Sequence, residues 1–95
     1  MSGYVFADVT WTDAEGRREY IELFGPSLAA HEGQVVALSG DAEVMEGDWQ
    51  PGEVTVLILF PTRGAALTWY RSDEYSRALD IRKRSSDSRL MIFGE

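Results

Sequence analysis

The chain has 95 residues, no cysteine and one histidine, and its 16 acidic side chains outnumber its 9 basic ones, which gives a formal charge of −7. The missing cysteines exclude disulfides and thiolate metal sites, and a single histidine excludes a histidine-rich metal site within one chain. An electrostatic field of this sign repels phosphate backbones, which argues against nucleic acid as a partner.

The length predicts one domain that covers residues 1–95. A chain of this size buries only about 60–70% of its unfolded surface, so its core is modest and contact with a second copy would add to it. No apolar run of about 18 residues and no signal-peptide pattern occurs, so we expect a cytoplasmic protein without a membrane contact. No glycine-rich phosphate loop and no nucleophile elbow is present, so no common enzyme class is indicated.

The first predicted element is a strand from Tyr4 to Trp11, because this stretch is rich in β-branched and aromatic residues. One face of the strand is wholly apolar and carries Val5, Ala7, Val9 and Trp11. The other face holds a carboxylate, Asp8, among mostly apolar neighbours. A carboxylate in such surroundings suits general acid–base work, so Asp8 is a candidate catalytic residue. The structural alternative is pairing with an arginine or contact with water at the end of the strand.

A helix is expected to follow, capped by Thr12 or Asp13 and running to about Ala30. Four residues at spacings of four, four and three mark one face of this helix: Tyr20, Phe24, Leu28 and His31. The pair Gly25-Pro26 is expected to kink or break the helix, because proline cannot donate the backbone hydrogen bond of the preceding turn.

His31 ends that helical stripe and has two interpretations. A histidine at the C-terminal end of a helix commonly bonds a carbonyl group or faces solvent. Alternatively, His31 lines a cleft near Asp8 or near the aromatic residues of the second helix and moves a proton. One histidine is also enough for the axial position of a haem, but nothing else in the sequence supports haem. We therefore predict no cofactor and no metal site.

The middle of the chain contains two more predicted strands. Gly33 is typical of a helix stop, and residues 34–39 form the second strand. Residues 40–52 form a long connection, with a short strand at 43–45 as one option. Residues 54–60 are the third strand. Trp49, in the turn of the long connection, is expected to cap the sheet or to reach a partner subunit.

The last part of the chain alternates back to helix and then to strand. Thr62 can cap a helix over residues 63–71, and Ser72 or Asp73 can start a second helical segment that runs to about Lys83. Residues 89–93 form the fourth strand. The resulting order is βαββαβ, which is typical of the ferredoxin-like α+β sandwich with an antiparallel four-stranded sheet.

Two of the predicted strands carry apolar residues on both of their faces. Residues 54–60 read VTVLILF, and residues 90–93 read LMIF. In a two-layer α+β domain the helices cover one face of the sheet, and a solvated second face makes the strands alternate apolar and polar residues. A second apolar face of this size needs a cover, because large exposed apolar patches are rare on monomers. The sequence therefore predicts a homodimer that forms through the faces of its sheets.

The helical segments after the third strand carry an aromatic group of Trp69, Tyr70 and Tyr75. Aromatic residues at helical spacing usually belong to the core, but three of them near a helix break can line a pocket between helices and sheet. Arg71 or Arg82 would then supply the charge that binds a carboxylate ligand. The structural alternative is a surface ion pair for Arg71 and a solvated helix end for Arg82.

Three stretches resemble a known family: EGDWQP at 46–51, FPT at 60–62 and AALTWYRS at 65–72. They are similar to the small family called domain of unknown function 1330, and the similarity covers nearly the whole chain. The resemblance implies a ferredoxin-like fold of the dimeric α+β barrel kind and no settled activity. In that family the position of Asp8 often carries histidine, which implies that an ionisable group matters there, and Arg82 matches an arginine.

Together these observations predict a protein that binds a small organic molecule in a cleft between helices and sheet. Analogy at the level of the fold adds cofactor-independent oxygenase or isomerase chemistry, and the alternative is a non-catalytic dimeric module that senses a ligand or binds a partner. The residues expected in the cleft are Asp8, His31, Trp69, Tyr70, Tyr75 and Arg82. The carboxylate and the histidine would move protons, the arginine would bind an anion, and the aromatic residues would form the walls.

Overall fold

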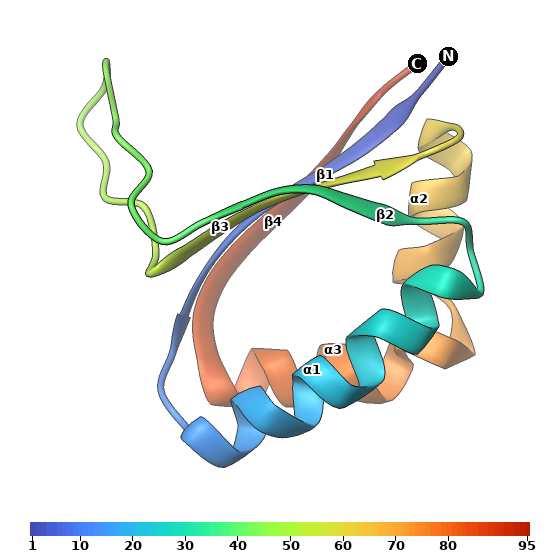
Figure 1. Cartoon of the computed structure of the whole chain (residues 1–95), viewed down its shortest axis with the longest axis horizontal. Helices are drawn as coiled ribbons and strands as arrows, with labels where there is room; N and C mark the ends of the chain where they lie inside the picture. Colours follow the sequence, from blue (N-terminus) through green and yellow to red (C-terminus); the bar gives the residue numbers. More distant parts are fainter.

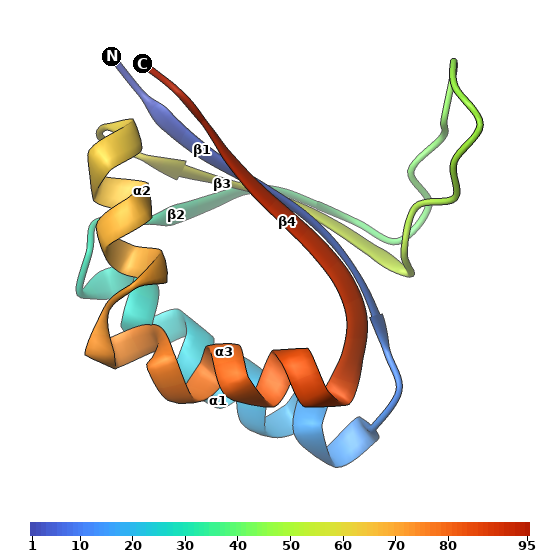
Figure 2. The same ribbon diagram turned by 180° about the vertical axis from the view of Figure 1, so that it is seen from behind.

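The computed structural model describes residues 1–95 and contains seven elements: β1 (Gly3–Trp11), α1 (Ala14–Ala29), β2 (Gln34–Ser39), β3 (Val54–Phe60), α2 (Arg63–Tyr70), α3 (Asp73–Ser85) and β4 (Ser86–Gly94). The strands form one antiparallel sheet in the order β2-β3-β1-β4. All helices lie on one face of this sheet, called the inner face here (Figure 1, Figure 2). The predicted βαββαβ order and ferredoxin-like α+β fold are confirmed.

Local capping sets where the helices begin. The side-chain oxygens of Asp13, Thr62 and Ser72 each accept a hydrogen bond from a backbone N–H in the first turn of the helix that follows. This is expected, because the first N–H groups of a helix have no intrahelical partner. Of the two outcomes expected at Gly25-Pro26, a break does not occur, because α1 runs through Pro26 to Ala29. Packing of this helix against the rest of the molecule outweighs the lost hydrogen bond. None of the helices has the length and apolarity needed to cross a bilayer.

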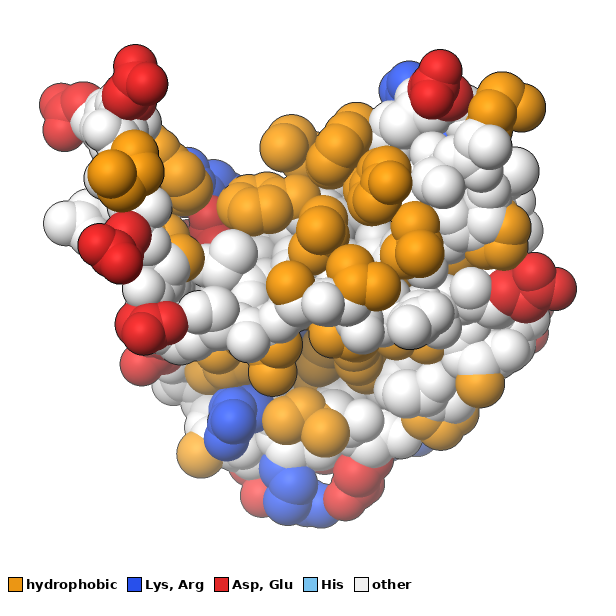
Figure 3. Space-filling model, turned by 45° about the horizontal axis from the view of Figure 1, so that its top comes forward, with side chains coloured by type: hydrophobic (Ala, Val, Ile, Leu, Met, Phe, Trp, Pro, Cys, Tyr) orange, Lys and Arg blue, Asp and Glu red, His pale blue; other side chains and the backbone are white.

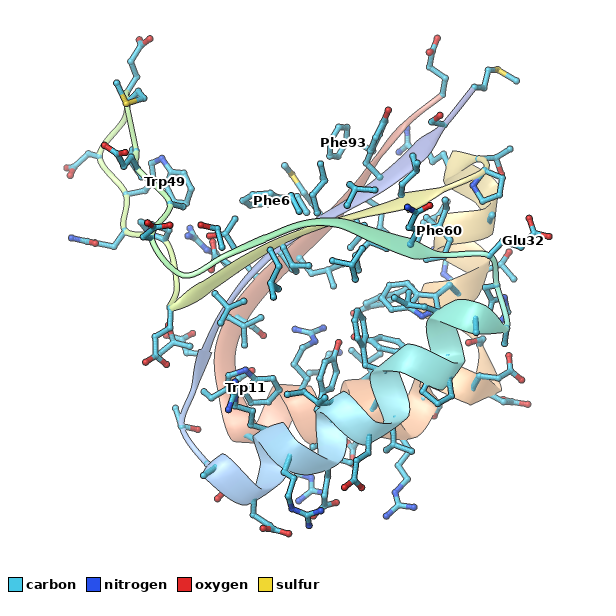
Figure 4. All side chains as sticks on the ribbon, in the orientation of Figure 1. Phe6, Trp11, Glu32, Trp49, Phe60 and Phe93 are labelled. Atoms are coloured by element: carbon cyan, nitrogen blue, oxygen red, sulfur yellow. The ribbon has the colours of Figure 1, made fainter.

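In the turn after α1 the left-handed conformation is adopted by Glu32 and not by Gly33, the glycine expected to stop the helix. Glu32 has a φ of 60°, and its side chain points away from the sheet and the helices (Figure 4). Gly33 is needed for another reason, since a Cβ at this position would lie 2.7 Å from the Phe60 ring. Gly33 therefore lets the backbone pass close over the core as it enters β2.

The long connection between β2 and β3 forms a projecting arm, residues 40–53 (Figure 1). It contains no strand at residues 43–45, because no neighbouring strand edge offers hydrogen bonds there. The arm returns to the sheet at Gly52, where a Cβ would lie 2.8 Å from the backbone of Val9. The Glu53 N–H then donates to Thr10 Oγ1 at 3.2 Å. Residue 52 must therefore be small for β3 to start in register.

The core lies between the inner face of the sheet and the helices. Its buried apolar members are Val5, Leu28, Ile58, Phe60, Ala66, Trp69, Tyr75 and Ala78. Burial of each large side chain contributes about 1.5–3 kcal/mol, so this cluster is a main source of stability. β4 starts directly after α3, three residues earlier than predicted, because Ser86 pairs with Trp11 at the end of β1. The first residues of β4 thereby extend the sheet beneath α3.

The face of the sheet opposite the helices, called the outer face here, is also apolar. Strand pairing groups its side chains Tyr4, Phe6, Leu57, Leu59, Met91 and Phe93, which we call the outer patch. Met91 is 56% exposed and Phe93 is 43% exposed. Figure 3 shows hydrophobic side chains gathered over the sheet between the arm and the chain ends, and Phe6 and Phe93 point away from the helices (Figure 4). The prediction of a sheet with two apolar faces is confirmed.

Candidate functional site

A cavity of about 310 Å³ lies between the inner face of the sheet and the helices. Thirteen of its 15 lining residues are apolar, and they include strand residues such as Val9 and Val56 and helix residues such as Phe24 and Trp69. β2 and α1 flank its mouth, which Figure 3 shows as a hollow with hydrophobic side chains beneath the edge of the sheet. The cavity is therefore a hydrophobic site that is open to small molecules from one side.

The floor of the cavity carries the guanidinium of Arg82 from α3, a residue that is only 4% exposed. Its Nε donates to the Tyr75 hydroxyl at 3.3 Å, and its Nη1 donates to Ser88 Oγ at 2.5 Å. No carboxylate lies within ion-pair distance of it. Burial opposes the charge on Arg82, but the hydroxyls of Tyr75 and Tyr20 outweigh burial and hold the pKa of the guanidinium above its ordinary value. Arg82 is thus a buried cation without a counter-ion.

Two phenols stand beside this cation. The hydroxyls of Tyr20, from α1, and Tyr75, from α3, lie 2.7 Å apart. Burial raises the pKa of Tyr20 well above its ordinary value of 10.0, and the neighbouring Tyr75 adds to this effect, so the Tyr20 hydroxyl keeps its proton at neutral pH. Sequence reasoning placed Tyr20 only in the apolar stripe of its helix. The sequence did offer a signal for Tyr20, because its hydroxyl lies on the same helical face as His31 and makes that face partly polar.

Four of the predicted cleft residues are close together. Trp69 and Arg82 line the cavity, and Tyr75 supports both, since its ring lies 4.1 Å from the Trp69 ring and its hydroxyl accepts from Arg82. Tyr70 packs behind them with its ring 6.0 Å from that of Tyr75, outside the cavity lining. Arg71, the other cation considered, is exposed and lies outside the cavity lining as well.

Asp8 does not join this group, because strand alternation turns it to the outer face. Its carboxylate forms an ion pair with Arg89, with 2.8 Å between Oδ2 and Nη2. Arg89 also lies over the ring of Trp49, 5.2 Å from its centroid, and donates to the Gln50 carbonyl at 3.2 Å. The arrangement matches the structural alternative given for Asp8, and it fastens the arm to the sheet.

His31 also lies outside the cavity lining. Its Nε2 is 2.6 Å from Glu74 Oε1, so it joins the end of α1 to the first turn of α3. The two residues predicted to move protons are therefore held apart, Asp8 in an ion pair on the outer face and His31 in a hydrogen bond between helices. No group of three or more His, Cys, Asp and Glu side chains is arranged to hold a metal ion.

Comparison with known proteins places this fold among proteins of mostly unknown function. The model of the family described as "Domain of unknown function (DUF1330)" matches residues 2–95, and no curated protein matches significantly. A solved structure of a protein of unknown function from Rhodopseudomonas palustris has a TM-score of 0.78 and 19% identity, over 99% of this chain and 82% of that chain.

Two further solved structures show the same fold at lower similarity. A dimeric ferredoxin-like protein of unknown function from Thermobifida fusca has a TM-score of 0.65 and 17% identity, over 100% of this chain and 92% of that chain. SnoaB from Streptomyces nogalater, described as a cofactor-independent oxygenase, has a TM-score of 0.59 and 13% identity, over 99% and 92% of the two chains. At these identities the likeness shows the fold alone.

Proposed function

The chain belongs to the family described as Domain of unknown function (DUF1330), and we propose that it binds a small organic molecule in the cavity between helices and sheet. The observation that carries the proposal is a cavity of about 310 Å³ whose apolar walls contain one buried guanidinium, that of Arg82. Small-molecule sites combine apolar walls with a few polar groups, in volumes of about 300–1,000 Å³. The volume found here suits a molecule of one or two rings.

The residues of the site have distinct parts in this proposal. Trp69 supplies a flat apolar wall, and Arg82 is the polar contact that orients the ligand. Tyr75 holds the guanidinium in place through its hydroxyl, and Tyr70 packs against Tyr75 from behind. Asp8 and His31 are not assigned a role in binding, since both lie outside the cavity lining.

Native mass spectrometry of freshly purified protein tests the proposed binding. The wild-type chain is expected to carry a reproducible additional mass of small-molecule size. Val56 lines the cavity, so the larger ring in Val56→Phe would occupy part of its volume. Because the packed walls cannot expand freely, this variant is expected to bind at least about tenfold more weakly, which is about 1.4 kcal/mol.

Val36→Phe is the matched control, because Val36 lies in the same sheet but is exposed and outside the cavity lining. It is expected to keep the additional mass at the wild-type level. Equal occupancy of Val56→Phe and the wild type would locate the ligand elsewhere on the molecule. A wild-type protein that is empty and binds no member of a panel of small aromatic and aliphatic compounds would overturn the proposal.

A second candidate function is cofactor-independent oxygenase or isomerase chemistry on the bound molecule. Its support is the fold shared with SnoaB, described as a cofactor-independent oxygenase, together with two phenols and a guanidinium beside an apolar cavity. Oxygenation predicts that the mass of the captured ligand increases during incubation in air, and isomerisation predicts that its chromatographic retention changes at constant mass. A non-catalytic sensing module predicts that the same ligand is recovered unchanged, which makes the two functions separable.

We also propose that two copies of the chain pack together through their outer patches. The exposure of Met91 and Phe93 supports this, as does the dimeric ferredoxin-like relative from Thermobifida fusca. An isologous contact lets one self-complementary patch cover both copies. The arm, with Trp49 turned toward the outer face (Figure 4), would flank the partner. In this arrangement the cavity stays on the other side of the sheet and remains accessible.

A further inference from the structure

We infer that the ligand of the cavity is an organic anion, with an apolar body against the walls and a carboxylate bound by Arg82; this rests on the proposed function. The first observation is the sign of the charges at the site. The chain carries a net charge of −7, yet the only two charged residues that line the cavity are both arginines, Arg17 and Arg82. An uncharged ligand would give neither cation a partner.

The second observation is the incomplete set of partners around Arg82. A guanidinium has five N–H donors, and here one N–H of Nε and one of Nη1 reach neutral hydroxyls, those of Tyr75 and Ser88. The Tyr20 hydroxyl also lies beside the guanidinium, but it is a neutral group as well, and no hydrogen bond forms from Nη2. A buried cation is strongly disfavoured unless it is paired and hydrogen-bonded. The unused Nη edge of the guanidinium matches the two oxygens of a carboxylate, which it can bind in a bidentate manner.

The third observation concerns the mouth of the cavity. Arg17 is exposed and forms no ion pair, whereas its neighbour Arg18 is paired with Glu15 and Glu22. An unpaired cation at the rim of a cleft raises the local concentration of anions and speeds their entry. Arg17 and Arg82 therefore form a positively charged route from the surface to the floor of the cavity. A single guanidinium at the floor suits a monocarboxylate rather than a phosphate.

Isothermal titration calorimetry with matched acids and amides tests this inference. The probes are benzoate, 2-naphthoate and hexanoate, each compared with its uncharged amide of nearly the same shape. At neutral pH and low salt, at least one acid is expected to bind the wild type about tenfold or more tightly than its amide. In Arg82→Met this preference is expected to disappear, while the affinity for the amide changes less than about threefold.

Two further variants keep the test decisive. Arg77→Met removes an exposed arginine of the same helix and is expected to leave the preference for acids unchanged. Arg82→Lys keeps the charge without the planar fork, and it is expected to retain a reduced preference even if Arg82→Met fails to fold. If no probe binds the wild type and the purified protein is also empty in native mass spectrometry, the proposed function and the inference both fall. If no probe binds but mass spectrometry finds a captured ligand that is uncharged, the inference alone is overturned. If acids and amides bind equally, or if the preference survives in Arg82→Met, the inference is overturned while binding in the cavity stands.

Discussion

Ser27 shows how one small hydroxyl fixes the largest side chain of the core. Its Oγ donates to the Phe24 carbonyl at 2.7 Å and accepts from Trp69 Nε1 at 3.0 Å. Ser27→Ala would leave the indole N–H buried without an acceptor. We expect this change to lower the free energy of unfolding by about 1–3 kcal/mol, measured by urea denaturation.

The matched control for this prediction is Ser76→Ala, because Ser76 is an exposed helical serine. Its effect on the free energy of unfolding should lie within about 0.5 kcal/mol. If Ser27→Ala behaves like this control, the hydrogen bond to Trp69 contributes nothing to stability, and the position of the cavity wall must be set by packing alone.

The residues of the candidate site could be predicted from the sequence only in part. The aromatic group could be chosen because amphipathic rings on helices over a sheet suit a pocket, and Arg82 was favoured as an anion-binding residue because it matches an arginine of the resembling family. Asp8 was assigned to the same cleft because alternation shows which strand residues share a face and does not show which face the helices cover. Both faces of this sheet are apolar, so hydrophobicity could not decide between them.

A close approach of α1 and α3 depends on Gly16 of α1. A Cβ on Gly16 would lie 2.1 Å from Ser85 Oγ and 2.4 Å from Ser85 Cβ in α3. A glycine inside a helix is usually less stable than alanine by about 0.5–1 kcal/mol, but Gly16→Ala would force the two helices apart. We expect this variant to lose about 1–3 kcal/mol of unfolding free energy in urea denaturation.

Gly64→Ala is the matched control, and it is expected to change the unfolding free energy in the opposite direction. Gly64 also lies in a helix, and the nearest atom to an added Cβ would be Thr62 Oγ1 at 3.8 Å, an ordinary contact. This variant should raise the unfolding free energy by up to about 1 kcal/mol. A stabilising Gly16→Ala would show that α1 and α3 can separate freely, and that the cavity between α1 and the sheet is not rigid.

Most elements could be predicted because their ends are encoded locally. The capping side chains Thr62 and Ser72 and the stop at Pro61 each act within one turn, so α2 and α3 were placed within two residues of their observed ends. Pro26 does not break α1, because tertiary packing of the helix opposes its local preference. The start of β4 at Ser86 depends on a partner strand far away in the sequence, which local patterns do not reveal.

At the scale of the whole molecule, one sheet separates two apolar surfaces with different expected partners. Met91, on the edge strand β4, is the most exposed side chain of the outer patch and pairs with Phe6. Met91→Asp would place a carboxylate in an apolar contact twice, once from each copy of a symmetric dimer. We expect this variant to be a monomer at micromolar concentrations where the wild type is a dimer, measured by size-exclusion chromatography with light scattering.

Ser76→Asp is the control, since it adds the same charge at an exposed position of α3, on the side of the sheet away from the outer patch. It should remain a dimer. A monomeric wild type would contradict the dimer proposal directly. A dimeric Met91→Asp would move the contact to another surface and leave the outer patch without an explanation.

The three tryptophans occupy three different environments, so intrinsic tryptophan fluorescence can report on different parts of the protein. Trp69 is fully buried in the cavity wall, Trp11 lines the same cavity near α1, and Trp49 lies on the arm beneath Arg89. Replacing the other two with phenylalanine would leave Trp69 as a single emitter without disturbing its hydrogen bond to Ser27. Its fluorescence maximum and quenching would then report on core integrity and on the filling of the cavity, and Trp49→Phe alone would show how much of the wild-type signal follows the approach of a second copy, without any attached dye.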